Sequence, residues 1–202
     1  GSYVWEDRHY DMLRLNQTDT PKVVLIGNSI THNWGGKPLN NRIKGAESWQ
    51  KYVEPYQVRN FGFGWDRVEN VLWRVYHDEF DGIAPEKIII NIGTNNLQLN
   101  TDNEIVEGLR FLVKAVQTRQ PQAKITLLGI YPRRAQELRV ATLNKAIQAM
   151  TKAEKVGFSD IGKGFLQKDG KINESLFSDG LHPNAAGYEE AGKRLEQELL
   201  KK

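Results

Sequence analysis

The 202-residue sequence contains no cysteine, and its four histidines are scattered rather than grouped. Without cysteine the chain forms no disulfide, holds no metal through thiolates and has no cysteine nucleophile. His9, His32, His77 and His182 lack the close spacing of a zinc site such as H-E-x-x-H. A bound metal is therefore not expected.

A surplus of one charge and a long apolar run are also missing. The 28 Lys and Arg residues nearly balance the 25 Asp and Glu residues, and the two signs are interspersed. Because no basic run alternates with aromatic residues, nucleic acid is not expected as a partner. No apolar stretch approaches the roughly 20 residues that a transmembrane helix needs, so no transmembrane segment is expected.

The first residues carry neither an initiator methionine nor a signal peptide. Gly1-Ser2 is typical of a scar left by cloning, and we expect that a native leader was removed, which favours an exported or periplasmic protein. Residues 3–202 contain no repeat, low-complexity segment or flexible linker. We therefore expect residues 3–202 to form one domain.

Short apolar runs alternate with amphipathic segments along the whole chain. We predict strands at residues 23–26, 57–60, 87–91, 124–130 and 156–158, the first of them a short apolar run that is typical of a buried parallel strand. The amphipathic segments predict helices at residues 3–16, 46–54, 67–77 and 139–152, one that Asp102 caps, and a last one that opens at Pro183 or Asn184 and ends near Leu200. This alternation predicts an α/β fold with a mainly parallel, five-stranded sheet.

Four polar, glycine-containing segments stand where such a sheet would place a ligand site. Ligands bind beyond the carboxyl ends of the strands in open parallel sheets. Residues 27–31, 60–66 and 93–96 follow the first three predicted strands, and residues 177–183 precede the last helix. We expect these segments to meet at one edge of the sheet.

Ser29 lies directly after the first predicted strand, at the start of a helical segment. A serine in this position has its hydroxyl at the ligand edge, close to the free N–H groups of a helix N-terminus. The alternative is that Asn28 or Ser29 only caps the helix, and the segment taken alone favours that interpretation. It also lacks the G-x-S-x-G pattern of the α/β-hydrolase elbow.

Asp179 and His182 stand three residues apart, in a loop bounded by Gly180 and Pro183. The histidine can donate its Nδ1–H to the carboxylate or to a nearby backbone oxygen, which leaves Nε2 free to accept a serine proton. The alternatives are a surface turn that Asp179 caps and, with weaker support, an Asp179–His182 metal pair.

Asn95 follows the third predicted strand, within the segment Gly93–Asn96. Its amide can donate to an oxyanion, and such donors contribute about 3–4 kcal/mol to transition-state stabilisation. The alternative is an ordinary turn, for which this composition is ideal.

The segment of residues 60–66 follows the second predicted strand. Its glycines allow close backbone approach, and Asp66 can cap the next helix. Its likeness to a dinucleotide loop is weak because the third glycine is absent.

Together, these segments resemble the sequence blocks of SGNH/GDSL hydrolases. Gly27-Asn28-Ser29 resembles the GDS block, residues 60–66 the glycine block, Gly93-Thr94-Asn95 the GxN block and residues 179–182 the DxxH block, all in family order. Residues 60–75 and 93–96 and the Pro132-Arg133 turn are similar to the catalytic subunits of intracellular platelet-activating-factor acetylhydrolases. The chain also resembles bacterial esterases that remove acetyl groups from carbohydrates.

The resemblance implies a three-layer, flavodoxin-like fold, a single hydrolase domain and no cofactor. It implies that Ser29 is the nucleophile, that His182 is first the general base and then the general acid, and that Asp179 orients His182. The backbone N–H of Ser29 and the side chain of Asn95 would hold the oxyanion.

Two positions depart from the family pattern. Asn28 replaces the usual aspartate, which removes a charge but keeps a turn-forming side chain. Trp65 stands where members often have a glycine whose N–H completes the oxyanion hole, and Gly64 lies one residue earlier. Either Gly64 or Trp65 would supply the third donor. The indole of Trp65 would then wall the acyl pocket and favour a small acyl group.

The expected function is hydrolysis of small acyl esters, acetyl above all, on a carbohydrate or other small molecule. Aromatic and polar residues around the site favour a sugar, and they are His32, Asn33, Trp34, Trp65, Asn96, Arg133 and Arg134. Leu181 is also expected to contact the substrate. The alternatives are a lysophospholipase or thioesterase acting on lipid acyl esters and a non-catalytic carbohydrate-binding domain of the same fold. A flavodoxin-like nucleotide binder is a further alternative, but the chain lacks a phosphate loop.

Overall fold

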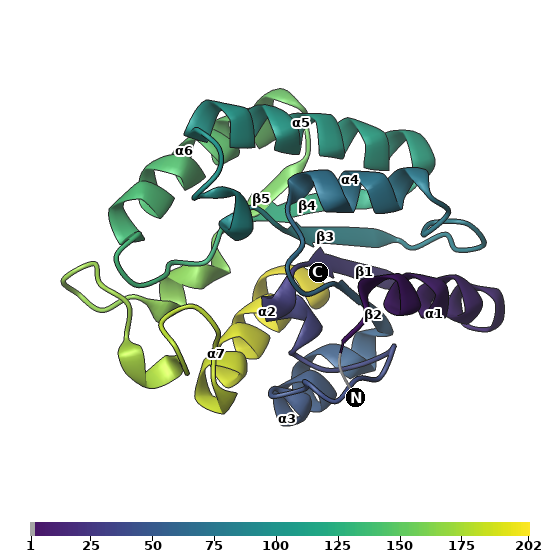
Figure 1. The fold of residues 1–202 in the computed structure, drawn as a ribbon, viewed down its shortest axis with the longest axis horizontal. Helices are drawn as coiled ribbons and strands as arrows, with labels where there is room; N and C mark the ends of the chain where they lie inside the picture. Colours follow the sequence, from purple (N-terminus) through teal and green to yellow (C-terminus); the bar gives the residue numbers. More distant parts are fainter. Residues whose placement is uncertain (1–2) are drawn as a thin grey trace.

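Five parallel strands form a single sheet at the centre of the computed structural model, which describes residues 3–202 (Figure 1). The predicted cloning scar, Gly1-Ser2, lies outside the described residues. The strands are β1 (Val23–Gly27), β2 (Val58–Gly62), β3 (Lys87–Asn91), β4 (Lys124–Leu128) and β5 (Gly157–Ser159). Their order in the sheet is β2-β1-β3-β4-β5, which is the flavodoxin-like order.

Helices cover both faces of this sheet. The regular helices are α1 (Trp5–Thr18), α2 (Ser29–His32), α3 (Ala46–Ser48), α4 (Val68–Tyr76), α5 (Asp102–Arg119), α6 (Glu137–Ala153) and α7 (Ala185–Leu195). Wider, π-helical turns extend α3 over Trp49–Val53 and α7 over Glu196–Leu200. Short 3₁₀ turns lie at Glu54–Tyr56, Thr94–Asn96, Ile161–Phe165 and Glu174–Leu176.

The helices divide into two layers, with α4, α5 and α6 on one face of the sheet and α2, α3 and α7 on the other (Figure 1). Helix α1 lies along the β2 edge, where Arg8 donates to the carbonyl oxygens of Asn60 and Gly62. The predicted α/β fold with a parallel five-stranded sheet is therefore confirmed, and the sheet is parallel throughout.

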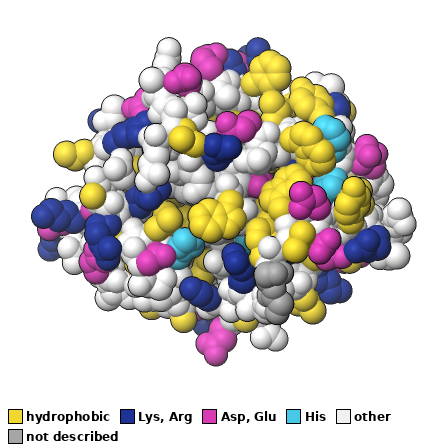
Figure 2. Space-filling view, in the orientation of Figure 1, with side chains coloured by type: hydrophobic (Ala, Val, Ile, Leu, Met, Phe, Trp, Pro, Cys, Tyr) yellow, Lys and Arg dark blue, Asp and Glu magenta, His cyan; other side chains and the backbone are white. Residues whose placement is uncertain are grey.

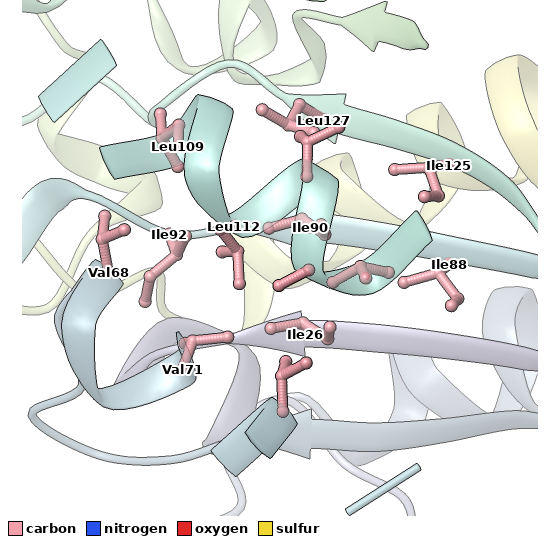
Figure 3. Close-up of a cluster of buried hydrophobic side chains, with 14 of the residues drawn as sticks. Ile26, Val68, Val71, Ile88, Ile90, Ile92, Leu109, Leu112, Ile125 and Leu127 are labelled. Carbon is pink, nitrogen blue, oxygen red and sulfur yellow. The ribbon is translucent and has the colours of Figure 1, made fainter. Parts of the chain in front are cut away.

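Branched aliphatic side chains fill the space between the sheet and the α4–α5 layer (Figure 3). Val68 and Val71 of α4 and Leu109 and Leu112 of α5 pack against isoleucines of β1 and β3. The opposite face packs against an aromatic layer that includes Trp34, Trp49 and Tyr188. Because both faces are covered, the central strands β1 and β3 are nearly continuous apolar runs rather than alternating ones.

Two helix starts show how local hydrogen bonds set the boundaries. Thr101, and not Asp102 as predicted, caps α5: its hydroxyl accepts from the N–H of Glu104, whose carboxylate accepts from the N–H of Thr101. This reciprocal pair is a capping box, whose T-x-x-E spacing is visible in the sequence. Asn184 caps α7 by accepting from the N–H of Gly187.

The strand order reverses between β1 and β3. The chain runs from β1 to β2 on one side and then crosses back over β1 to reach β3. A crevice forms at such a reversal, outside the carboxyl ends of the two strands. Ser29 follows β1 and Gly93–Asn96 follows β3, so the topology brings both segments to this point.

Across the described residues, no helix is long and apolar enough to span a bilayer.

Candidate active site

Ser29 is the first residue of α2, immediately beyond β1. Its neighbour Asn28 caps the helix, because the Asn28 side chain accepts from the N–H of Ile30 at 2.9 Å. Asn28 therefore takes the capping role that Ser29 could have had. The Ser29 hydroxyl instead lies 2.8 Å from Nε2 of His182, which is 153 residues later in the chain.

Asp179 holds the other side of the His182 ring, with 2.7 Å between its Oδ2 and Nδ1 of His182. Its Oδ1 accepts from the backbone N–H groups of Leu181 and His182. Burial alone would raise the pKa of the Asp179 carboxyl, but the hydrogen bonds from His182 and Leu181 outweigh burial and bring it to about 2. The carboxylate is thus ionised at neutral pH and fixes the imidazole ring with Nε2 towards Ser29.

Arg134 supports the loop that carries Asp179 and His182. Its backbone N–H donates to the carbonyl of Gly180, and its guanidinium pairs with Glu174 at 2.7 Å. Gly180 has a φ of +77°, and a Cβ there would lie 2.7 Å from the Arg134 guanidinium carbon. The glycine is therefore required both by its left-handed backbone and by the close approach of Arg134.

Asn95 lies in the 3₁₀ turn after β3, at the same edge of the sheet as Ser29. Its Nδ2 donates one hydrogen to the carbonyl of Asp66 at 2.9 Å, which fixes the plane of the amide. The second hydrogen of this NH2 group can point towards a ligand. Asn95 is partly exposed, as Ser29 and His182 are, so the three side chains are reachable from solvent.

Gly64 and Trp65, the two candidates for the third oxyanion donor, differ in what their N–H groups do. The N–H of Gly64 donates to Nδ1 of His32 at 3.0 Å and is therefore engaged. The N–H of Trp65 has no acceptor within the described part of the chain. Trp65 has a φ of +70°, the left-handed region that favours glycine, which explains why glycine is usual at this position.

The indole of Trp65 is 78% exposed. It lines a surface hollow together with Trp5 and Trp73, and the lining includes neither Ser29 nor His182. This placement contradicts the expectation that the indole walls the acyl pocket. The left-handed backbone turns the side chain towards α1 and α4.

His32 was expected to contact substrate, but it is only 1% exposed. Its Nδ1 accepts from Gly64, so the ring proton sits on Nε2, which has no hydrogen-bond partner within residues 3–202. Burial, together with the positive charges of Arg8, Arg42 and Arg74, lowers its pKa to about 3. His32 is thus a neutral support for the Gly64 loop and not a substrate contact.

Trp34 and Asn96 are likewise buried, and the prediction that they bind substrate is wrong for both. Trp34 is 2% exposed and donates its indole N–H to Ser48 within the aromatic layer. Asn96 accepts from the N–H of Val68 at the start of α4 and donates to Glu69. Periodicity does not predict which loop side chains turn inwards, because that depends on the packing of other elements.

Arg133 and Leu181 are among the predicted substrate contacts that stay accessible, since both are partly exposed. Arg133 is partly exposed and donates to the carbonyl and hydroxyl oxygens of Thr94. Burial lowers the pKa of its guanidinium, while the carboxylate of Asp179 acts in the opposite direction. Leu181 packs partly against the α7 side of the core. Asn33, in contrast, is buried.

The sequence interpretation missed a buried ionic network beneath the site. Arg74 donates to Asp66 at 2.9 Å, to Glu79 at 2.6 Å and to the carbonyl of Phe61. The other carboxylate oxygen of Asp66 accepts from the indole N–H of Trp5 at 2.6 Å. Asp66 is therefore not a helix cap but the link between this network and Asn95. The available signal was Arg74 itself, a charged residue on the apolar face of α4.

Within residues 3–202, no three His, Asp or Glu side chains gather as the ligands of a metal ion would. The crevice instead combines a hydroxyl, an imidazole and a carboxylate in series with amide donors beside them. This is the arrangement by which a serine is activated and an oxyanion is stabilised.

Known proteins share both the sequence pattern and the fold. Residues 25–190 match the GDSL-like lipase/acylhydrolase family. The chain is 29% identical to platelet-activating factor acetylhydrolase IB subunit alpha1 of Bos taurus, over 100% of this chain and 84% of the relative. It is 31% identical to the alpha2 subunit of Rattus norvegicus, over 99% and 85%. A GDSL-like lipase from Bacteroides thetaiotaomicron has the same fold, with a TM-score of 0.77 and 18% identity over 96% of this chain and 95% of that one.

Proposed function

The chain belongs to the GDSL-like lipase/acylhydrolase family, as the order of its sequence blocks predicts, and is a carboxylic ester hydrolase; on that premise we propose that Ser29 is its nucleophile. The observation that carries the proposal is the continuous series from Ser29 through His182 to Asp179, with distances of 2.8 and 2.7 Å. A serine hydroxyl is a weak nucleophile unless a neighbouring base accepts its proton.

In the first step, Oγ of Ser29 attacks the ester carbonyl carbon while Nε2 of His182 takes the hydroxyl proton. Asp179 accepts Nδ1–H of the imidazole, so Nε2 carries the lone pair that this transfer needs. The same carboxylate stabilises the imidazolium that results. Because hydrogen bonds keep the pKa of Asp179 low, it remains an anion throughout.

Three donors stabilise the oxyanion in this proposal: the N–H of Ser29, the N–H of Trp65 and Nδ2 of Asn95. Gly64 is excluded because His32 already accepts from its N–H. Donors of this kind contribute about 3–4 kcal/mol each when they point at the developing charge. His182 then protonates the leaving alcohol, and a water molecule, activated by the same histidine, releases the carboxylate from Ser29.

For the substrate we propose a short acyl ester, acetyl above all, on a carbohydrate. The names of the mammalian relatives specify an acetylhydrolase, which supports the acetyl group. The same names specify platelet-activating factor, so a lipid ester is the second candidate. The exposed aromatic ring of Trp65 beside the crevice favours the sugar.

Replacement of Ser29 by alanine tests the mechanism. With an aryl acetate as substrate, kcat is expected to fall by roughly 10⁴-fold or more, because removal of the nucleophile leaves only the oxyanion donors and substrate binding. The far-ultraviolet circular dichroism spectrum and Tm should match those of the wild type. Undiminished turnover would remove Ser29 from the mechanism. The same pair of proteins, assayed on acetylated xylan, acetylated sugars, sialate esters and phospholipids, identifies the substrate class.

A further inference from the structure

A hollow lies on the surface between the start of α1 and α4, outside the catalytic series. It has a volume of about 550 Å³ and is lined mainly by Trp5, Glu6, Trp65, Glu69, Asn70 and Trp73, which we call the tryptophan hollow. Figure 2 shows hydrophobic side chains gathered with histidine over the region of α1 and α4. A contiguous patch of exposed apolar side chains often marks a binding site, whereas a single exposed side chain does not.

Two of the aromatic walls of the hollow, Trp5 and Trp73, are held in place. Trp5 and Trp73 contact each other edge to face, with ring centroids 5.4 Å apart, and the indole N–H of Trp5 is anchored on Asp66. Trp73 is also stacked on His77, with 3.7 Å between ring centroids. Trp65 and Trp73 nevertheless remain 78% and 43% exposed. Rigid, exposed ring faces bind a ligand at a low cost in side-chain entropy.

The polar groups of the hollow are mostly acceptors. Glu6 is exposed, and Glu69 already accepts from Asn96. Asn70 uses its oxygen on the N–H of Arg67, which leaves its NH2 group as a donor. No Lys, Arg or His is among the residues that line the hollow. Carboxylates and an amide beside flat rings suit the hydroxyls and C–H faces of a neutral sugar and disfavour an anionic group.

The hollow is joined to the crevice through two residues. Trp65 lines the hollow with its indole, while its N–H is the proposed third oxyanion donor. Asp66 accepts from Trp5 with its carboxylate and from Asn95 with its carbonyl. Trp65 and Asp66 are therefore shared by the hollow and the surroundings of Asn95.

We propose that the tryptophan hollow binds a neutral sugar ring in the alcohol part of the ester. This deepens the proposed function and rests on it, because the ring is placed relative to an ester at Ser29. Stacking on Trp65 and Trp73 supplies the contact, and Glu6 and Asn70 accept from and donate to the sugar hydroxyls.

Binding without catalysis gives the first test. Ser29→Ala protein is titrated with xylotetraose, which carries no ester, and binding is followed by tryptophan fluorescence and calorimetry. Saturable binding is expected, and Trp73→Ala in the same background should weaken it by roughly fivefold or more, since buried aromatic contacts dominate such sites. Glu6→Ala should weaken it as well, and this exposed position carries little risk to folding. Phe111→Ala, which removes a 59% exposed ring of α5 outside the hollow, is the matched control.

Turnover gives the second test. Trp73→Ala should lower kcat/KM for acetylated xylotetraose at least fivefold more than it lowers kcat/KM for an aryl acetate, which is too small to reach the hollow. Phe111→Ala should leave this ratio at the wild-type value. The Tm of each variant is measured first, so that a folding defect in Trp73→Ala leaves Glu6→Ala as the deciding variant.

The proposal is overturned if xylotetraose does not bind, or if both Trp73→Ala and Glu6→Ala bind it as tightly as Phe111→Ala does. It is also overturned if these two variants weaken binding of phosphatidylcholine vesicles and not of xylotetraose. Failure of the proposed function would look different: Ser29→Ala would still hydrolyse the aryl acetate, whatever the result for sugar binding.

Discussion

Replacement of His32 by asparagine is expected to make the protein lose less stability when the pH is lowered from about 7 to about 5. Burial and three nearby arginines lower the pKa of His32 to about 3, against an ordinary value of 6.5. Below about pH 6.5, the unfolded chain therefore binds a proton at this position that the folded protein rejects. Stability falls as pH falls through this window, and the loss is complete only near the folded pKa.

The size of the effect follows from the two pKa values. Each pH unit inside the window changes the free energy of unfolding by about 1.4 kcal/mol for one proton. In the unfolded chain, His32 begins to bind its proton near its ordinary pKa. Acidification from about pH 7 to about pH 5 therefore lowers the free energy of unfolding by about 2 kcal/mol. This is a large part of the roughly 5–15 kcal/mol that stabilises a typical domain.

Urea unfolding at the two pH values measures it. His32→Asn keeps an oxygen that can accept from Gly64 but does not titrate. Its free energy of unfolding should therefore differ between about pH 7 and about pH 5 by about 2 kcal/mol less than that of the wild type does. His32→Leu should show the same reduced pH dependence and lower stability at both values, because the N–H of Gly64 loses its acceptor. Equal pH dependence in wild type and His32→Asn would refute the reasoning.

Three further substitutions test the surroundings of the site. Arg74→Met removes the cation shared by the buried carboxylates of Asp66 and Glu79, which keep only Trp5 and His9 as side-chain partners within residues 3–202, and should lower the free energy of unfolding by about 3–5 kcal/mol; a urea midpoint close to that of the wild type would contradict the buried network. Asn95→Ala should lower kcat for an aryl acetate by about 10²–10³-fold with a smaller effect on KM, and steady-state kinetics that show a change in KM alone would argue against an oxyanion donor. Gly62→Ala would place its Cβ 2.3 Å from the backbone nitrogen of His32 and should cost about 1–3 kcal/mol or more, which thermal unfolding would show as a lower Tm.

The central strands β1 and β3 are the elements that the sequence predicts best, whereas β2 and β4 each differ from the prediction by two residues at their carboxyl ends. The boundaries of β3 agree with the predicted residues 87–91, and β1 differs only by the addition of Gly27. Both strands are covered on two faces, and this burial produces the uninterrupted apolar runs from which they are recognised. The short β5 strand, at the edge of the sheet, is displaced by one residue at each end.

The crevice was predictable to the extent that topology determines it. Ser29 and Asn95 follow adjacent parallel strands, so their meeting follows from the strand order. His32, Trp34 and Asn96 are predicted to contact the substrate because they lie in or next to these segments, yet all three turn inwards. Flanking position does not distinguish a side chain that faces the ligand from one that supports the loop.

For the buried charges, local pattern gives one signal, Arg74 on the apolar face of α4, and does not identify its partners. A charged residue in an amphipathic helix ordinarily lies on the solvated face, whereas Arg74 is buried with its two carboxylate partners. One of these partners, Asp66, lies before α4 and the other, Glu79, lies after it. Only the folded arrangement brings the three together.

The left-handed backbone at Trp65 has a consequence for variation at this position. A residue other than glycine gives up about 1–2 kcal/mol in this conformation, so glycine or asparagine would fit the loop with less strain. The tryptophan side chain buries little and gains little stability in return, since it is 78% exposed. A library selected for heat resistance and a library selected for turnover of a bulky alcohol ester would therefore diverge at residue 65. The first would drift towards small residues, and the second would keep an aromatic ring.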